Sequence, residues 1–338
     1  IIGLEATSVY GDSLVCFLRE DGHLAPYNKK IHVLNPKQVK KFKDAYPDLP
    51  KNDYVDAYII ADALRFGRIN NEVYMYDYRY KALQNLTRAR FFAVQNQTKE
   101  KQRFLNYLFM KYSSLAQEKV FSNTFSTTAL AVYEEFDSAD ELAYMDLDEL
   151  TNFIKEKGKN RFPNPDEVAK SIQAAARGSY RLPKTVNDSV NQVLSISISS
   201  IRALDAQIKA FDKAIADQLE LIPNTLTSIK GIGPVYSAGI IAEIGDINRF
   251  SNQAALAKYA GLACTQYQSG NFESQNTRLI NSGNRFLKYY LYEAALSLVR
   301  CDSEYKRFYN LKYKEVNKYQ HKRALALTAR KFVRLVFL

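Results

Sequence analysis

The feature that most constrains this chain is a long stripe of apolar residues between Val190 and Ile222. Pro223 and Asn224 follow it and end the helical pattern. Apolar side chains recur along the stripe at every third or fourth position, at Val190, Leu194, Ile198, Ile201, Leu204, Ile208, Phe211, Ile215, Leu219 and Ile222. A helix of this kind must bury its stripe, so we expect a coiled-coil helix over 186–222. A long helix packed on its own domain satisfies the same pattern.

Strand-like and helix-like runs alternate at the start of the chain. We expect strands over 1–4 and 31–34 and helices over 9–20, 36–45 and 53–66. This alternation is typical of an α/β layer with some parallel strand pairing. The first run is already strand-like and the last is still helical at Leu338, so we expect further elements beyond both ends. The expected fold class is α/β plus α.

Charge is distributed unevenly over the 338 residues, whose formal net charge is +11. Residues 79–111 hold eight bases against one acid, interleaved with aromatic residues, and residues 276–338 hold 14 bases against 4 acids. Two basic segments of this kind favour a nucleic-acid backbone as partner, although a solvated surface helix explains either one alone. Residues 117–150 carry nine acids against Lys119, and we interpret 112–185 as a helical insertion.

Several classes of protein are disfavoured. The three cysteines (Cys16, Cys264 and Cys301) are too few and too scattered for a disulfide framework or a cysteine-rich zinc site. With only three histidines, metal binding would rest on carboxylates, which favours Mg²⁺. No apolar run approaches the ~18 residues that span a bilayer, so we expect no membrane partner and a cytoplasmic protein.

The segment from Leu226 to Ile241 has the form of a helix-hairpin-helix motif around Gly231 and Gly233. In that motif a glycine turn presents backbone N–H groups to a phosphate at a helix N-terminus. A glycine-rich turn that serves only packing is the alternative.

Three acids are candidate metal ligands. Glu5 follows the first strand, and the spacing of Asp53 and Asp56 places both carboxylates on one face of a helix. Such carboxylates can share a divalent ion, whereas acids on a solvated helix surface have the same spacing.

Blocks from both halves of the chain resemble those of one family. They are Glu5-Ala6-Thr7-Ser8-Val9-Tyr10, Val33-Leu34-Asn35-Pro36-Lys37-Gln38-Val39, Lys51-Asn52-Asp53 with Asp56-Ala57, Gly231-Ile232-Gly233-Pro234, Ala242 to Phe250, Tyr259-Ala260-Gly261-Leu262 and Gln268-Ser269-Gly270. In this order they resemble the DEDD-type insertion-sequence transposases, also called the "IS one-ten" or Piv/MooV family. The stretch 112–185 does not contribute to the resemblance.

The resemblance implies a RuvC-like, RNase-H-type catalytic domain over 1–111, whose N-terminal strands are missing. After the 112–185 insertion and the coiled-coil helix over 186–222, it implies a mostly helical transposase domain over 223–338. Four acids bind Mg²⁺ in the family, and Glu5, Asp53 and Asp56 match the last three. The first is expected upstream of Ile1, because Asp12 and Asp62 lie outside the matching blocks.

The resemblance also implies a serine nucleophile, which matches Ser269. We expect Ser269 on a loop that faces the acid cluster across DNA, from the same or another subunit. Arg249, Arg278, Arg285 and Lys288 are candidates for binding phosphate.

The leading functional hypothesis is a recombinase that moves its own mobile element through a transient 5′-phosphoserine linkage. The family implies a nucleoid-associated prokaryotic protein and a bridge RNA that pairs with donor and target DNA. We expect a dimer, and then a dimer of dimers, assembled through the 190–222 helix at Ile201, Ile208 and Ile215. The alternatives are a Mg²⁺-dependent nuclease of the Holliday-junction-resolvase kind and a non-catalytic nucleic-acid-binding protein.

Overall fold

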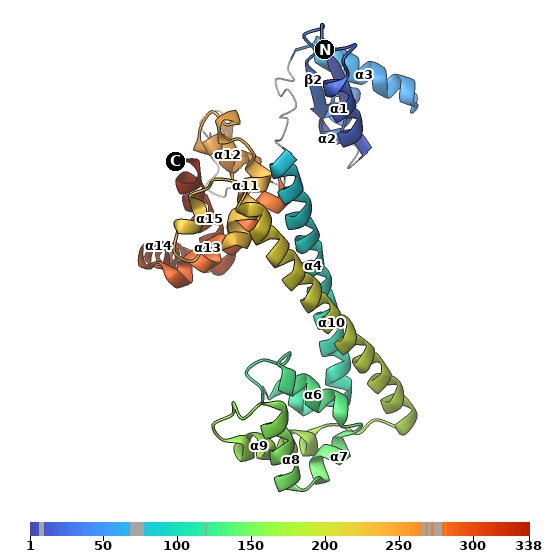
Figure 1. Ribbon diagram of the computed structural model, residues 1–338, viewed down its shortest axis with the longest axis vertical. Coiled ribbons are helices and arrows are strands. Elements are labelled where there is room, and N and C mark those ends of the chain that lie inside the picture. The colour runs from blue at the N-terminus through green and yellow to red at the C-terminus, as the bar shows by residue number, and fades with distance from the viewer. Residues whose placement is uncertain are drawn as a thin grey trace. The chain divides into compact units, whose positions relative to one another are not determined.

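The computed structural model describes residues 1–6, 10–67, 78–118, 120–264, 268–269, 272–273, 279–280 and 282–338. The chain divides into two compact units, Ile1–Asp77 and Tyr78–Leu338 (Figure 1). Each unit is described by itself below.

The first unit pairs two parallel strands and packs helices against them. Strand β1 (Ile2–Glu5) pairs with β2 (Ile31–Leu34) in a register that joins Ile2 to Ile31 and Glu5 to Leu34. The helices are α1 (Tyr10–Glu20), α2 (Pro36–Lys43) and α3 (Asp53–Arg65). The alternation and the parallel pairing expected from the sequence are confirmed, with element ends shifted by at most two residues.

Two asparagines and one glycine explain why the elements of this unit form where they do. Asn35 and Asn52 cap α2 and α3 by accepting hydrogen bonds from the backbone N–H groups of Lys37 and Val55. At Gly3, an added Cβ would lie 2.3 Å from Leu64 Cδ1, so the absence of a side chain lets β1 lie directly on α3. The resulting core contains Leu34, Val39, Ile59 and Ala63.

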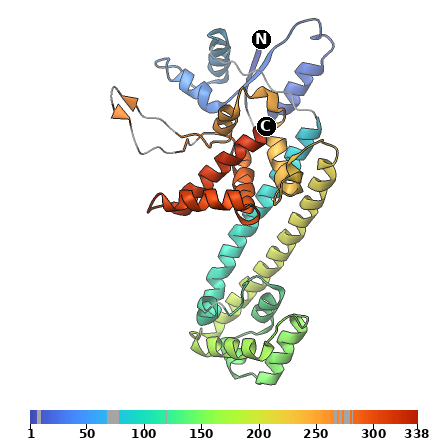
Figure 2. The ribbon, with the colours of Figure 1, turned by 90° about the vertical axis from the view of Figure 1, so that its left-hand side faces the viewer.

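Two long antiparallel helices run through the second unit. Helix α4 (Tyr78–Lys111) and helix α10 (Lys184–Leu219) lie side by side in both ribbon views (Figures 1 and 2). Apolar clusters join them at each end, around Phe104 and Ile201 and around Leu83 and Ile215. Polar pairs join them in between: Arg90 with Asp212, Gln97 with Asp205 and Ser197 with Glu100.

This pairing corrects the expected role of the apolar stripe. Residues 184–219 do form one helix, but Ile201 and Ile215 are fully buried against other residues of the same chain and Ile208 is half-buried. The expectation that a second copy packs on Ile201 and Ile215 is wrong, because α4 supplies the partner helix within the chain. The second compact unit also begins at Tyr78, since α4 packs along α10.

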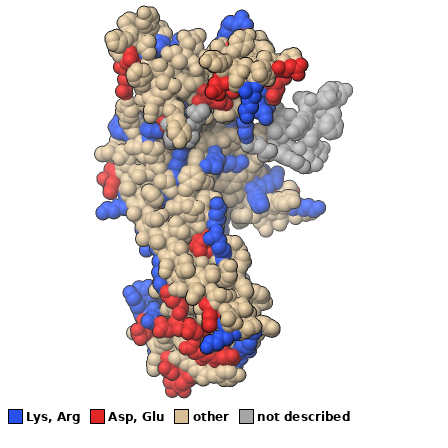
Figure 3. Space-filling model, turned by 90° about the vertical axis from the view of Figure 1, so that its right-hand side faces the viewer, with Lys and Arg blue, Asp and Glu red and all other residues tan. Residues whose placement is uncertain are grey.

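A helical module joins the far ends of α4 and α10. It consists of α5 (Ser113–Gln117), α6 (Thr127–Glu135), α7 (Ala139–Tyr144), α8 (Leu147–Lys157) and α9 (Pro165–Gly178). Its core shares one apolar cluster with the ends of α4 and α10. Acidic side chains gather on its surface (Figure 3), as expected from the nine acids of residues 117–150.

The C-terminal module is also helical. It contains α11 (Pro234–Ile244), α12 (Gln253–Tyr259), α13 (Arg285–Cys301), α14 (Ser303–Lys314) and α15 (Gln320–Phe337), with short 3₁₀ turns η1 (Leu226–Ser228) and η2 (Ile247–Arg249). A core that includes Ile240, Tyr290, Leu291 and Phe332 holds the module together. Within the described residues, no helix is long and apolar enough to cross a membrane.

Candidate active site and nucleic-acid interface

The three predicted acids lie on two neighbouring elements of the first unit. Glu5 is the last residue of β1, and Asp53 and Asp56 lie in the first turn of α3, which packs against β1. Asp53 is exposed, whereas Glu5 and Asp56 are half-buried. The spacing of three places Asp53 and Asp56 on one side of α3 as expected.

Asp56 already has a cationic partner. The Nζ of Lys43, from the end of α2, lies 2.7 Å from Asp56 Oδ1. In the part of the chain that the structure describes, no three His, Cys, Asp or Glu side chains form a group that could hold a metal ion. Glu5, Asp53 and Asp56 provide the hard oxygen ligands that Mg²⁺ prefers, but their side chains are not gathered around a common point.

Asp62 has a structural role in the same helix. It is buried, accepts a hydrogen bond from the Tyr46 hydroxyl, and pairs with Arg65 through contacts of 2.6 and 2.9 Å. The Tyr46 hydroxyl and the Arg65 guanidinium lower the pKa of Asp62 below its usual value. A carboxylate held in this way joins α3 to the chain that follows α2.

Ser269 lies at the end of a short strand. Strand β3 (Gln268–Ser269) pairs antiparallel with β4 (Phe272–Glu273), and Ser269 is opposite Phe272. We expected a loop at this position, whereas Gln268 and Ser269 pair with Phe272 and Glu273 in a two-strand ladder. The side chains of both strands lie outside the described residues.

The base of this hairpin is fixed to the C-terminal module. A bridge pairs Cys264 with Leu279, and the Ile280 N–H donates to the Ala263 carbonyl at 2.9 Å. Further along, the Asn284 N–H donates to the Tyr259 carbonyl at 2.7 Å. Both ends of the segment that carries Ser269 are therefore held by backbone hydrogen bonds.

A buried acid that sequence reasoning missed lies beneath the hairpin base. Glu243 of α11 is fully buried and accepts two hydrogen bonds from Arg88 of α4, at 2.7 and 2.9 Å. Asn284, the capping residue of α13, donates to the same carboxylate at 2.6 Å. The network links three helices, and its signal in the sequence is a single acid within the apolar run of residues 234–244.

The predicted phosphate-binding cations lie against aromatic rings. Exposed Arg285, at the start of α13, lies over the Phe286 ring at 4.7 Å and the Phe92 ring at 5.4 Å. Arg249 lies 4.7 Å from the rings of both Phe250 and Tyr259. Stacking on rings holds a guanidinium in place, and the exposed Arg285 can contact a phosphate from this position.

The remaining predicted cations are less informative. Lys288, in the first turn of α13, is half-buried. Arg278 lies outside the described residues.

The glycine segment differs from the expected helix-hairpin-helix. Only the three-residue turn η1 precedes the glycines, so the first helix of the motif is absent from this described stretch. Gly231 has a positive φ of 94°, and an added Cβ would lie 2.9 Å from the Cys301 Cβ, which makes its main role packing against α13. Gly233 precedes α11 with open space around its Cα.

Two family models match the chain at opposite ends. A model of DEDD transposases of the IS110 type matches residues 1–111, and the model described as "Transposase IS116/IS110/IS902 family" matches residues 224–310. Together these ranges span more than half of the chain. The first contains Glu5, Asp53 and Asp56, and the second contains Ser269.

Curated proteins of insertion elements are similar over much of the chain. A 44.8 kDa protein of insertion element IS116 from Streptomyces clavuligerus is 26% identical over 80% of this chain and 67% of its own length. A candidate transposase of the IS117 mini-circle from Streptomyces coelicolor is 26% identical over 76% of this chain and 65% of its own length. This chain thus spans about two thirds of these relatives. With both family models matched in the same order, the chain belongs to the DEDD transposases of the IS110 family.

Proposed function

We propose that this protein cuts and rejoins the DNA of its own insertion element, with Ser269 as the nucleophile. The observation that supports this most is the pair of family matches, one over the acids of the first unit and one over the hairpin of Ser269. The anchored base of the hairpin adds to this support, because a nucleophile must be held close to its reactive geometry.

In the proposed reaction, Ser269 Oγ attacks a phosphodiester phosphorus. The bond from phosphorus to the 3′ oxygen breaks, the 3′ oxygen leaves with a proton, and the DNA stays attached to the protein as a 5′-phosphoserine. Attack by the 3′ hydroxyl of another strand reverses the step and restores the serine. Because a serine hydroxyl is a weak nucleophile at its ordinary pKa, it needs help in losing its proton.

Glu5, Asp53 and Asp56 are the residues that would hold Mg²⁺, which would stabilise the charge that develops on the phosphate. Their oxygen ligands suit this ion. Asp56 must exchange Lys43 for the ion, since Lys43 now neutralises that carboxylate. Lys43 would then neutralise Asp56 until the ion binds.

The proposal includes a bridge RNA that selects donor and target DNA by base pairing, as the family resemblance implies. It also includes assembly of two or more copies, since two duplexes must be held together. Ile201 and Ile215 are buried within their own chain, so assembly must use other surfaces.

A denaturing gel tests the proposal. The full-length protein is incubated with Mg²⁺, labelled DNA that carries the element with its flanks, and RNA transcribed from the element. We expect a covalent protein–DNA band for the unchanged protein and none for Ser269→Ala, which should still bind DNA. Ser282→Ala, a change at an exposed serine near the same segment, is the matched control and should keep the band.

Two outcomes would contradict the serine mechanism. Strand exchange by Ser269→Ala would move the chemistry to hydrolysis by water. Free nicked ends without a covalent band would favour the nuclease alternative.

A further inference from the structure

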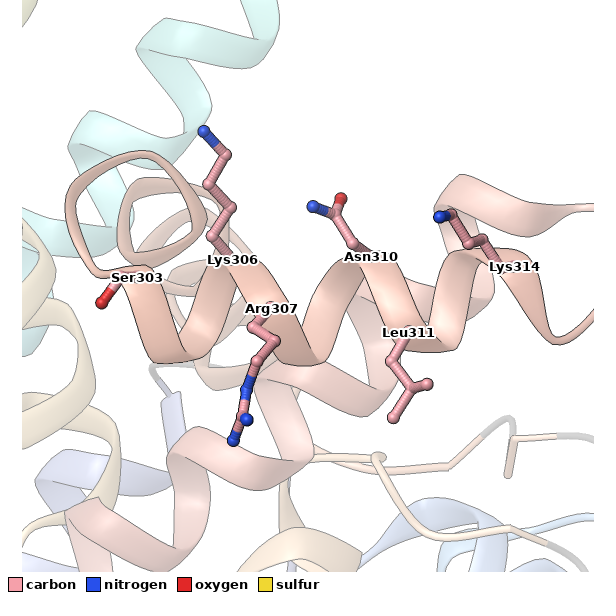
Figure 4. A pocket seen from close by; sticks show the side chains of 6 residues that line it. All are labelled: Ser303, Lys306, Arg307, Asn310, Leu311 and Lys314. Carbon is pink, nitrogen blue, oxygen red and sulfur yellow. The ribbon is translucent and has the colours of Figure 1, made fainter.

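Helix α14 carries an outward face that nothing above uses. Its inner face packs through buried Tyr305 and half-buried Phe308. Its outward side chains line a shallow groove of about 480 Å³ (Figure 4). All six are exposed: Ser303, Lys306, Arg307, Asn310, Leu311 and Lys314.

These six residues form two rows at helical spacing. Ser303, Arg307 and Leu311 are four apart, and Lys306, Asn310 and Lys314 are four apart in the neighbouring row. Figure 4 shows the Lys306 and Asn310 side chains on one side of the helix and those of Arg307 and Leu311 on the other. The two rows define a stripe, the α14 stripe, that contains three cations and no acid.

Three other cations near α14 have acidic partners. Lys312 and Arg323 both pair with Glu315, at 2.5 and 2.9 Å, and Lys331 pairs with Glu304 at 2.5 Å. Within the described residues, no carboxylate lies within 4.0 Å of the cationic groups of Lys306, Arg307 or Lys314. The acids of this region therefore neutralise one set of cations and leave the α14 stripe charged.

We propose that the α14 stripe is a docking surface for the phosphodiester backbone of duplex DNA. Three exposed cations of one helix, none with a carboxylate partner among the described residues, match a polyanion, because each can release a condensed counterion from a phosphate. From Lys306 to Lys314 the helix rises about 12 Å, which equals the rise of three to four base pairs at about 3.4 Å each.

Two further properties favour DNA over RNA. A single exposed helix is narrow enough to follow the open major groove of B-form DNA, whereas the major groove of A-form RNA is too deep and narrow to admit side chains. Exposed Leu311, at 58% of its full accessibility, lies between the cations, where an apolar side chain suits contact with sugars or thymine methyl groups better than contact with bulk water. The inference rests on the proposed function only in taking DNA as the substrate.

The test neutralises the stripe in the full-length protein with Lys306→Gln, Arg307→Gln and Lys314→Gln. The matched control is Lys155→Gln, Arg161→Gln and Lys170→Gln, which removes two lysines and one arginine from exposed positions of the α8 and α9 region. Binding to a random-sequence DNA duplex and to an RNA duplex of equal length is measured across a range of salt concentrations.

We expect the stripe variant to bind duplex DNA at least about tenfold more weakly at 0.15 M salt. Its plot of log affinity against log salt should be shallower by about two to three, since each phosphate contact contributes about 0.9 to the slope. The control and the RNA duplex should change little, and thermal unfolding of both variants should match that of the unchanged protein.

An unchanged DNA slope, an equal loss in the control, or a loss for RNA alone would overturn the α14 proposal. These results would not change the covalent protein–DNA band that depends on Ser269, so they would not contradict the proposed reaction. A protein that bound no DNA at all would overturn both.

Discussion

The environments of Asp53 and Asp56, in the first turn of α3, differ from that of Glu243 in α11. Glu243 is fully buried and its oxygens are held by Arg88 and Asn284. Asp53 is exposed, and Asp56 is 41% exposed with one lysine partner. A buried charge must be fully paired to be tolerated, whereas a carboxylate that receives a metal ion must remain open. The difference separates an acid that holds the structure from acids available for chemistry.

The strongest test of this difference is to neutralise an exposed acid. We expect Asp53→Asn to lower strand exchange by at least about 10³-fold, because a metal ligand is lost. The free energy of unfolding should change by less than about 1 kcal/mol, the scale of an acid at a helix N-terminus. Gel assays of strand exchange and denaturant unfolding measure the two effects. A large loss of stability would place Asp53 with the structural acids.

Removing the buried acid Glu243 should instead lower mainly the stability of the protein. Glu243→Ala removes the buried carboxylate that accepts from Arg88 and Asn284, and we expect a loss of about 3 kcal/mol in the free energy of unfolding. Glu304→Ala, which removes an exposed partner of Lys331, is the control and should cost less than about 1 kcal/mol. Urea unfolding of the two variants makes the comparison, and equal losses would contradict it.

Lys111 shows what happens when a buried charge lacks an ionic partner. It is 3% exposed, its Nζ donates to the Tyr133 carbonyl at 3.1 Å, and no carboxylate in the described residues lies within salt-bridge distance. Burial lowers its pKa to about 8, below the value of about 10.4 expected in the unfolded chain.

The unfolded state therefore binds more protons between these two pKa values, and stability should rise from about pH 8 to about pH 10. We expect a rise of about 2 kcal/mol relative to Lys111→Met, which cannot titrate at this position. Denaturant unfolding at several pH values measures the difference. If the free energy of unfolding of the unchanged protein and of Lys111→Met changed in parallel with pH, Lys111 would not be the group that titrates.

The smallest expected effect concerns Lys43. Lys43→Ala frees Asp56 from its cation, so the Mg²⁺ concentration that gives half-maximal strand exchange should fall several-fold. Stability should change by at most about 1 kcal/mol, because the pair is partly exposed. A Mg²⁺ titration of activity checks this, with Lys40→Ala of the same helix as control. A higher requirement for Mg²⁺ would show that Lys43 supports the acids instead of competing for them.

The sequence by itself determined the local elements and the family. Hydrophobic periodicity placed β1, β2, α3 and α10 to within about three residues, because the apolar spacing that fixes a strand or helix is local. The resemblance of the motif blocks to one family agrees with both family matches. The Asp53–Asp56 spacing likewise fixed which side of α3 carries both acids.

Only the tertiary structure decided which groups meet. The partner of the α10 stripe proved to be α4, more than a hundred residues away at the Arg90–Asp212 pair, and no local pattern distinguishes that partner from a second copy. The structure shows that Gly231 packs against α13 and that Glu243 pairs with Arg88 of α4. The cations of the α14 stripe can be recognised only in the structure, because the structure shows that nearby acids pair with other bases. The sequence specifies which residues are charged. Whether a charge is neutralised depends on the neighbours that folding brings next to it.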